Sequence, residues 1–135
     1  MFLDASAIIA MLADEANGDV FSDALSTAEN RLTSPIAVWE AVAGLVKEYP
    51  LSVREARAKV ADFLAIAGIN TVAIGPSELA VAIDAYDQFG KGRHPARLNM
   101  GDCFAYAAAR CNGASILHKD AGFYLTDIAS ALDRR

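Results

Sequence analysis

Four acidic residues stand next to, or inside, stretches that are otherwise apolar. They are Asp4, Glu40, Asp102 and Asp120. Carboxylates held a few ångströms apart raise one another's pKa, and a hard cation such as Mg²⁺ or Mn²⁺ relieves that repulsion because it prefers oxygen ligands. A cluster of these four would predict metal-dependent hydrolysis of a phosphodiester bond, with a metal-activated water molecule as the nucleophile.

Three of the acids also have ordinary structural explanations. Asp4 can cap the helix that follows it, and Asp120 fits a turn. Asp102 stands three residues after Asn99, as the acid of a capping box does. Glu40 lies too deep in its predicted helix to act as a cap, and no basic residue lies within one helical turn of it. Because burying a lone ionised glutamate costs several kcal/mol, Glu40 carries most of the argument for a cluster.

The elements that position these acids are short apolar runs alternating with stretches of helical period. The predicted strands cover 1–3, 31–34, 70–74 and 114–117. The predicted helices cover 7–15, 18–30, 35–49, 52–68, 77–89 and 100–112. The segment 90–99 is irregular, and 122–135 is ambiguous between helix and loop.

Strands separated by helices need crossover connections, which predicts a mainly parallel sheet with helices on both faces. The expected fold is a three-layer α/β/α sandwich, formed by a single domain over residues 1–135. In such sheets, ligands bind outside the carboxyl ends of the strands. Asp4 follows the first strand and Asp120 follows the fourth. Glu40 lies in the second turn of the helix that leaves the second strand, and Asp102 lies in the first turn of the helix that enters the fourth. All four are therefore expected at one edge of the sheet.

The composition limits the classes of function that fit. The chain has 135 residues, a net charge of −5 and 54% hydrophobic residues. The negative charge excludes a general basic field for nucleic acid, so contact with a nucleic acid would be local or bridged by metal. The high apolar fraction favours a sheet covered on both faces, or an apolar surface for a partner protein.

Several other chemistries lack their motifs. His94 and His118 lie far apart without a zinc-type spacing, and neither a glycine-rich phosphate loop nor a G-x-S-x-G motif occurs. Cys103 and Cys111 are eight residues apart in one predicted helix, about 12 Å, which is too far for a disulfide. Both are expected to be small buried residues in a reducing compartment. With no visible signal peptide or membrane span, the expected location is the cytoplasm.

Basic side chains are concentrated just before Asp102. The irregular segment contains Lys91, Arg93, His94 and Arg97. If this loop lies beside the acidic cluster, these residues would hold the phosphates on either side of the bond that is cut. The alternative is an ordinary solvated surface loop.

Four blocks of the sequence resemble those of PIN-domain ribonucleases, and most of all the VapC toxins of bacterial type II toxin–antitoxin pairs. The blocks are FLDASAIIA, SPIAVWEA, HPARLNMGDCFAYAAA and ILHKDAGFYLTDI, in that order along almost the whole chain. The resemblance implies that Asp4, Glu40, Asp102 and Asp120 bind Mg²⁺ or Mn²⁺. It further implies that Ser6 supports the metal shell.

The same resemblance implies an endoribonuclease that acts as a toxin on RNA. It implies a homodimer and a small VapB-like antitoxin, a segment of which lies over the apolar helices and blocks the acidic site. The last block departs from the KGDDF found in many relatives, because here Lys119 and Asp120 precede Ala121, Gly122 and Phe123. Asp127 is an alternative to Asp120, although a structural role suits it better.

Other readings place acids at strand ends as well. A phosphoacceptor receiver domain needs paired acids after its first strand, and a haloacid-dehalogenase phosphatase needs Asp-x-Asp, whereas Asp4 is followed by Ala5 and Ser6. A non-catalytic PIN-type binding scaffold would not need all four acids. A nuclease directed at DNA or at flap structures remains the main alternative among enzymes.

Overall fold

Four short strands form the centre of the computed structural model, which describes residues 1–132. They are β1 (Phe2–Leu3), β2 (Leu32–Thr33), β3 (Asn70–Thr71) and β4 (Ile116–Leu117). Every pairing is parallel, and the order across the sheet is β3-β2-β1-β4. The prediction of a mainly parallel sheet is confirmed, and each strand falls within its predicted range.

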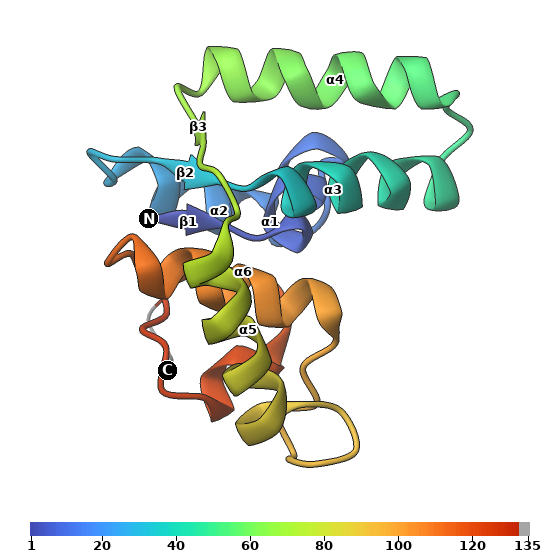
Figure 1. The fold of residues 1–135 in the computed structure, drawn as a ribbon. Coiled ribbons are helices and arrows are strands. Elements are labelled where there is room, and N and C mark those ends of the chain that lie inside the picture. The colour runs from blue at the N-terminus through green and yellow to red at the C-terminus, as the bar shows by residue number, and fades with distance from the viewer. Residues whose placement is uncertain (133–135) are drawn as a thin grey trace.

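Helices cover both faces of this sheet (Figure 1). They are α1 (Ala5–Leu12), α2 (Gly18–Ser26), α3 (Pro35–Glu48), α4 (Val53–Ile66), α5 (Pro76–Phe89) and α6 (Met100–Cys111). Each corresponds to a predicted helix, with shifts at the ends. The largest shift is in α2, which stops at Ser26 rather than at residue 30. The three-layer α/β/α arrangement is thus confirmed.

Local capping explains where several helices begin. Ser34 accepts a hydrogen bond from the backbone of Ala37 and precedes Pro35, so α3 starts where the sequence predicts. Ser52 and Glu55 form the predicted capping box of α4. The first helix starts at Ala5, two residues earlier than predicted, because Asp4 is its cap.

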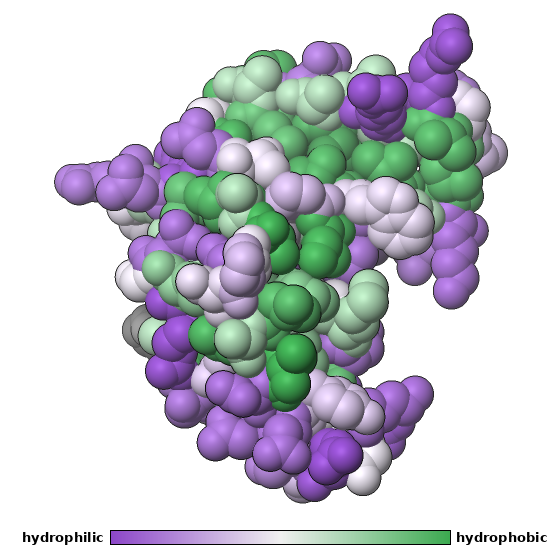
Figure 2. Space-filling model, in the orientation of Figure 1, coloured by the Kyte–Doolittle hydropathy of each residue, from purple (hydrophilic) through white to green (hydrophobic). Residues whose placement is uncertain are grey.

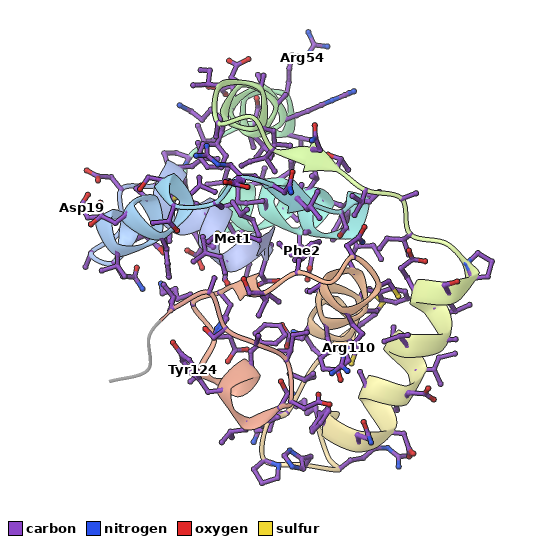
Figure 3. All side chains as sticks on the ribbon, turned by 90° about the vertical axis from the view of Figure 1, so that its left-hand side faces the viewer. Met1, Phe2, Asp19, Arg54, Arg110 and Tyr124 are labelled. Carbon is purple, nitrogen blue, oxygen red and sulfur yellow. The ribbon has the colours of Figure 1, made fainter. Side chains whose placement is uncertain are left out.

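Two hydrophobic clusters lie on the two sides of the sheet. Neighbouring strand residues point to opposite faces, so Phe2 and Ile116 join the cluster under α5 and α6, whereas Leu3 and Leu117 join the cluster under α1 to α4. In Figure 3, Met1 and Phe2 lie between the two groups of helices, and Asp19 and Arg54 project outward. Side chains on both faces therefore hold the carboxyl ends of the strands in place.

The ambiguous tail contains a short 3-10 helix, η1 (Ala121–Leu125), followed by a single parallel bridge between Ser130 and Ile116. Residues 133–135 of the predicted range lie outside the described part of the chain. Both cysteines are free, as predicted, but the prediction that both are buried is wrong: Cys103 is buried and Cys111 is exposed, because it ends α6. Within residues 1–132, no helix is long and apolar enough to cross a membrane.

Candidate active site

Asp4 lies where β1 passes into α1 and is only 5% exposed. Its Oδ2 accepts hydrogen bonds from the hydroxyl of Ser6 at 2.7 Å and from the Ser6 amide at 3.3 Å. The Ser6 hydroxyl in turn accepts the backbone N–H of Lys119 at 3.0 Å. Burial raises the pKa of Asp4, although the bonds from Ser6 oppose the rise. One hydroxyl therefore connects the ends of β1 and β4.

Glu40 projects from the second turn of α3 toward the start of α6. Its carboxylate lies against Gly101, so closely that a Cβ at Gly101 would overlap it. Burial raises the pKa of Glu40 to about 7, and the charges of Asp4 and Asp102 add to the rise. Within the described residues Glu40 has no hydrogen bond or ion pair.

Asp102 occupies the first turn of α6 and is 9% exposed. Its Oδ2 accepts the Asn99 N–H at 3.0 Å, while its own N–H donates to Asn99 Oδ1 at 2.8 Å. Burial raises the pKa of Asp102 to about 7; the Asn99 bond opposes this, and the charges of Asp4 and Asp120 add to it. The capping box is real, and because it engages one carboxylate oxygen it is compatible with a place in the cluster.

Asp120 follows β4 and caps η1, with its Oδ1 accepting the Gly122 N–H at 2.9 Å. The turn is tight, since a Cβ at Gly122 would overlap the carbonyl oxygen of Ala96. The charge of Asp120 acts on Asp102, as noted above, so the two lie on the same side of the molecule. Asp120 is exposed, unlike Asp4 and Asp102.

These four residues, called here the acidic edge, come from four separate parts of the chain. Their mutual effects on pKa link Asp4 to Glu40 and Asp102, and Asp102 to Asp120. Carboxylate oxygens with repulsion to relieve suit Mg²⁺ or Mn²⁺ chemically. In the described part of the chain, however, no group of three or more His, Cys, Asp or Glu side chains is arranged to hold a metal ion. A bound cation would have to draw these side chains closer together.

The basic loop is less directly connected to the acidic edge. It is closed at its base by a bridge between Gly90 and Leu98. Arg93 pairs with Asp87 at 3.4 Å and stacks on the Tyr86 ring.

The remaining basic residues of this loop also make no contact with the acids. His94 accepts the Ala96 N–H through Nδ1 and packs edge-on against Phe89. Lys91 and Arg97 are exposed. Within residues 1–132, no hydrogen bond or ion pair joins these side chains to the acidic edge. The segment reaches the acidic edge at its end, where Asn99 bonds Asp102.

Two residues beside the acidic edge were not singled out by the sequence patterns. Lys119 pairs with Glu15 of the segment after α1, at 2.9 Å. His118 is almost completely buried, and burial lowers its pKa although Asp4 and Asp120 oppose the fall. The available signal was position, because both residues stand between a buried strand and Asp120.

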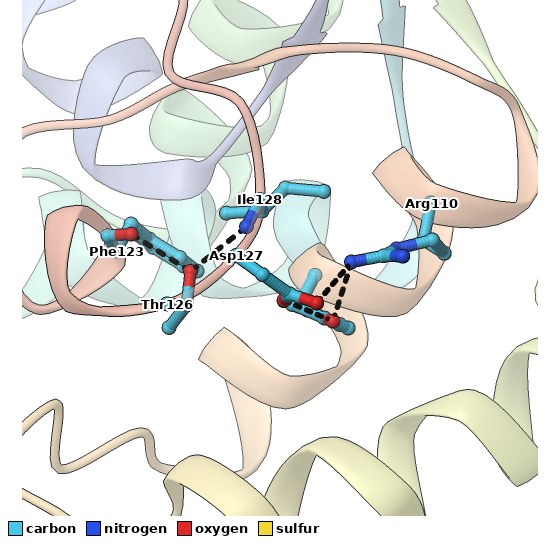
Figure 4. Close-up of polar contacts among 6 residues, drawn as sticks. Arg110, Phe123, Thr126, Asp127 and Ile128 are labelled. Carbon is cyan, nitrogen blue, oxygen red and sulfur yellow. Dashed lines mark hydrogen bonds and ion pairs between the residues drawn. The ribbon is translucent and has the colours of Figure 1, made fainter.

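Asp127 belongs to a different cluster, the tail clamp, formed by Tyr106, Arg110 and Asp127 (Figure 4). The Tyr106 hydroxyl donates to Asp127 Oδ1 at 2.6 Å, and Arg110 donates to Asp127 Oδ2 at 2.9 Å and to the Tyr106 oxygen at 2.7 Å. The bond from Tyr106, followed by Arg110, lowers the pKa of Asp127. These partners favour the structural role expected for Asp127 over a place among the metal ligands.

The face shown in Figure 2 has hydrophobic residues gathered over α3, α4 and α5. Trp39, next to Glu40 in sequence, is 70% exposed. A groove between α3 and α4 is lined by Pro35, Val38, Trp39, Val42 and Val53. A second apolar hollow lies between α5 and α6, lined by residues that include Leu79, Ile83, Tyr86, Met100 and Phe104.

Comparisons with known proteins agree with this architecture. A family model described as PIN domain matches residues 1–129. The chain is 35% identical to a VapC ribonuclease of Rhizobium meliloti, over 94% of this chain and 98% of that protein. It is 37% identical to Ribonuclease VapC30 of Mycobacterium tuberculosis, over 96% and 97%. The crystal structure of Mycobacterium tuberculosis VapC20, a sarcin–ricin loop cleaving toxin, covers 95% of each chain with a TM-score of 0.73 and 18% identity, which supports the fold.

Proposed function

This chain belongs to the PIN domain family, among the VapC ribonucleases, and on that premise we propose that it is an endoribonuclease acting as the toxin of a toxin–antitoxin pair. In this proposal residues 1–135 act as one domain in the cytoplasm, where the RNA is. The observation that carries the proposal is Glu40. Its carboxylate has no described partner, points at the start of α6, and has a pKa raised to about 7 by burial and by Asp4 and Asp102.

The acidic edge is the proposed catalytic and metal-binding site. Asp4, Glu40 and Asp102 would be the principal ligands of Mg²⁺ or Mn²⁺, with Asp120 as the fourth acid. A divalent cation bound there would activate water and offset negative charge on the attacked phosphate. Ser6 orients Asp4 through its 2.7 Å hydrogen bond, and Asn99 orients Asp102 through the capping box. These hydrogen bonds restrict the rotamers of Asp4 and Asp102.

Two groups of basic residues lie close in sequence to acids of the acidic edge, and we assign the contacts with RNA phosphates to them. One is the loop with Lys91, Arg93, His94 and Arg97. The other is Lys119, whose backbone N–H reaches Ser6 and whose side chain is half-exposed. Because Arg93 is already paired with Asp87, we assign the loop's contacts with RNA phosphates to Lys91 and Arg97 first.

The apolar surfaces suit the two expected protein partners. A VapB-like antitoxin segment would lie in the groove between α3 and α4, where Trp39 is 70% exposed one residue from Glu40. An exposed aromatic residue in an apolar groove is a common anchor for a partner helix. The hollow between α5 and α6 would serve a second copy of the chain in a homodimer. Each assignment can be tested by substituting one exposed side chain. Trp39→Ser should weaken binding of the antitoxin, and Ile83→Asp should disrupt the homodimer.

The decisive experiment is cleavage of total RNA by the purified chain, free of antitoxin, with Mg²⁺, Mn²⁺ or EDTA. Asp4→Asn and Glu40→Gln are assayed beside it, and Asp127→Asn is the matched control. We expect cleavage that EDTA stops, that both site variants lose, and that the control keeps. Cleavage surviving in both site variants would overturn the assignment of the site.

Two alternatives are separated by the same assay. Duplex DNA and flap-bearing DNA are offered as substrates in parallel, and their preferential cleavage would favour a DNA-directed nuclease. A folded protein that binds RNA without cutting it, with or without metal, would favour the non-catalytic scaffold.

A further inference from the structure

His118 is a buried polar residue that the proposed chemistry does not use. It follows β4 directly, stands two residues before Asp120 and is 1% exposed. Its Nδ1 lies 2.7 Å from the backbone carbonyl oxygen of Asp120, and its Nε2 lies 3.0 Å from the hydroxyl of Ser130. A buried imidazole with both nitrogens engaged is a fixed structural unit.

The partners of the two nitrogens determine where the proton sits. A carbonyl oxygen can only accept, so Nδ1 must carry the hydrogen. In the neutral ring Nε2 is then an acceptor, and the Ser130 hydroxyl donates to it. That hydroxyl also accepts the Leu132 N–H at 3.1 Å, which leaves its own proton for His118. When neutral, the ring is therefore held as the Nδ1–H tautomer.

The ring also connects three segments that surround the acidic edge. It packs against Phe123 and Tyr124 of η1, with ring centroids 5.1 Å and 4.8 Å away. On its other side Ser130 forms the bridge to Ile116, and the Ile116 N–H donates to the Ala129 carbonyl at 2.9 Å. Its imidazole thus spans the distance between the Asp120 turn and the returning tail.

Asp120 depends on this support because it stands on a short turn rather than in a helix or strand. Its carboxylate is oriented by the Gly122 N–H, and Gly122 is pressed against the Ala96 carbonyl. The backbone of Asp120 itself is held by the Nδ1–H bond from His118. We propose that His118 is a positioning residue for the acidic edge: its Nδ1–H fixes the Asp120 backbone, and so the direction in which the Asp120 carboxylate faces Asp102.

This inference rests on the proposed function only in taking Asp120 as part of the acidic edge. Two substitutions separate positioning from packing. His118→Asn places an amide N–H near the Nδ1 position and keeps a donor for the Asp120 carbonyl. His118→Phe keeps an aromatic ring against Phe123 and Tyr124 but removes that donor. Ser130→Ala removes the other partner of the ring and leaves Nδ1–H in place.

The first measurements need neither metal nor RNA. Ring ¹⁵N shifts should show protonated Nδ1 and unprotonated Nε2 in the wild type. Hydrogen exchange of the Gly122 amide should accelerate about tenfold in His118→Phe and little in His118→Asn, while the Asp102 amide, held by Asn99, stays unchanged in both. An Nε2–H tautomer, or equal exchange at Gly122 in the two variants, would overturn the proposal.

The second measurement uses cleavage of RNA by the protein in the presence of Mn²⁺. The Mn²⁺ concentration for half-maximal cleavage should rise roughly tenfold in His118→Phe, at the lower end of the range for residues that orient metal ligands. It should stay near the wild-type value in His118→Asn and Ser130→Ala, and the KM for RNA should not change in any of them. A changed KM with an unchanged Mn²⁺ requirement would overturn the proposal. If the wild type cuts no RNA, the proposed function fails, yet the tautomer and the exchange rates still decide the role of His118.

Discussion

The two ends of α6 carry two clusters of polar side chains with opposite electrostatics. At the first turn, Asp102 belongs to the acidic edge, where burial and neighbouring carboxylates raise the pKa of Glu40 and Asp102 to about 7. At the last turn, Arg110 belongs to the tail clamp, where Tyr106 and Arg110 lower the pKa of Asp127. The helix dipole favours an acid at the first position and a cation at the last, so it does not distinguish them.

The difference lies in how each carboxylate is satisfied. Asp127 has a hydroxyl donor and a guanidinium within 3 Å, and its charge is balanced by Arg110 in a half-exposed ion pair. Asp102 has one backbone donor and only other acids acting on its charge. A cluster of carboxylates without a positively charged partner lowers the stability of the metal-free protein. This is the pattern expected where a cation is to bind. Pairing, rather than residue type, therefore distinguishes Asp127 from Asp102.

The largest expected effect is on cleavage. Asp102→Asn retains an oxygen for the Asn99 N–H, so α6 keeps its cap, but the acidic edge loses a charge. We expect the cleavage rate to fall at least about a hundredfold, as when a group that stabilises charge in a transition state is removed. Asp127→Asn should change the rate less than about threefold. Initial rates on one RNA under saturating Mn²⁺ test this, and similar losses in both variants would contradict it.

The second effect is on stability as a function of pH. The pKa of Asp102 is raised to about 7 in the folded protein, so its favourable contribution is complete at pH 4 and is lost as the pH rises toward 7. Asp102→Asn has no proton to lose. We expect it to leave the unfolding free energy nearly unchanged at pH 4 and to raise it by about 2 kcal/mol at pH 8. This is about half the full conversion of the shift, because the neighbouring acids titrate together with Asp102 and share the effect.

The tail clamp should show the opposite sign. The pKa of Asp127 is lowered, so its stabilising contribution is present at pH 8 and disappears as the pH falls below its ordinary value. Asp127→Asn should therefore be less stable than the wild type at pH 8 and nearly equal to it at low pH. Urea unfolding of both variants and the wild type in metal-free buffer at pH 2, 4, 6 and 8 measures these differences. The same dependence on pH in the two variants would contradict the opposite signs expected for Asp102 and Asp127.

Sequence patterns could predict that the four acids lie at one edge of the sheet, because their positions depend on strand order and helix starts. Asp4 and Asp120 follow buried strands, and the capping motif at Asn99 marks the first turn that contains Asp102. Parallel pairing then brings these positions to one edge. The four strands and six helices could be predicted for the same reason, since apolar period and capping residues are local signals.

Partners set by tertiary folding could not be predicted. The pairing of Lys119 with Glu15 joins residues 104 positions apart, and the clamp on Asp127 uses residues from α6. The burial of His118 depends on Ser130, in a tail whose pattern was ambiguous. Likewise, nothing local distinguishes Cys103 from Cys111, because exposure of the second follows from where α6 ends.

A smaller effect tests whether cleavage depends on the position of the Glu40 carboxylate. Gly101→Ala adds a methyl group where the Glu40 carboxylate lies. Alanine is the better helix former by up to about 1 kcal/mol, so a purely structural glycine would tolerate the change. We expect instead roughly a tenfold loss of cleavage, the low end of the penalty for disturbing a residue that orients a metal ligand.

Gly44→Ala is the matched control, because its new methyl group would meet only the flexible end of Ile9. It should keep its activity. Equal activity in the two variants would show that the Glu40 carboxylate can be moved without consequence.

The smallest effect is expected from Tyr106→Phe in the tail clamp. The substitution removes one hydroxyl from a buried ring that also packs against Phe89, while the ion pair between Arg110 and Asp127 at 2.9 Å can persist. The hydroxyl makes two hydrogen bonds, to Asp127 and from Arg110. Because their ion pair is half-exposed and both partners keep each other, the free energy of unfolding should fall by only about 1 kcal/mol. The cleavage rate should not change, since the clamp only ties the tail to α6. Thermal unfolding and the RNA assay together test this. If the variant lost cleavage activity while keeping its full stability, the tail clamp around Asp127 would have to influence the acidic edge at the other end of α6.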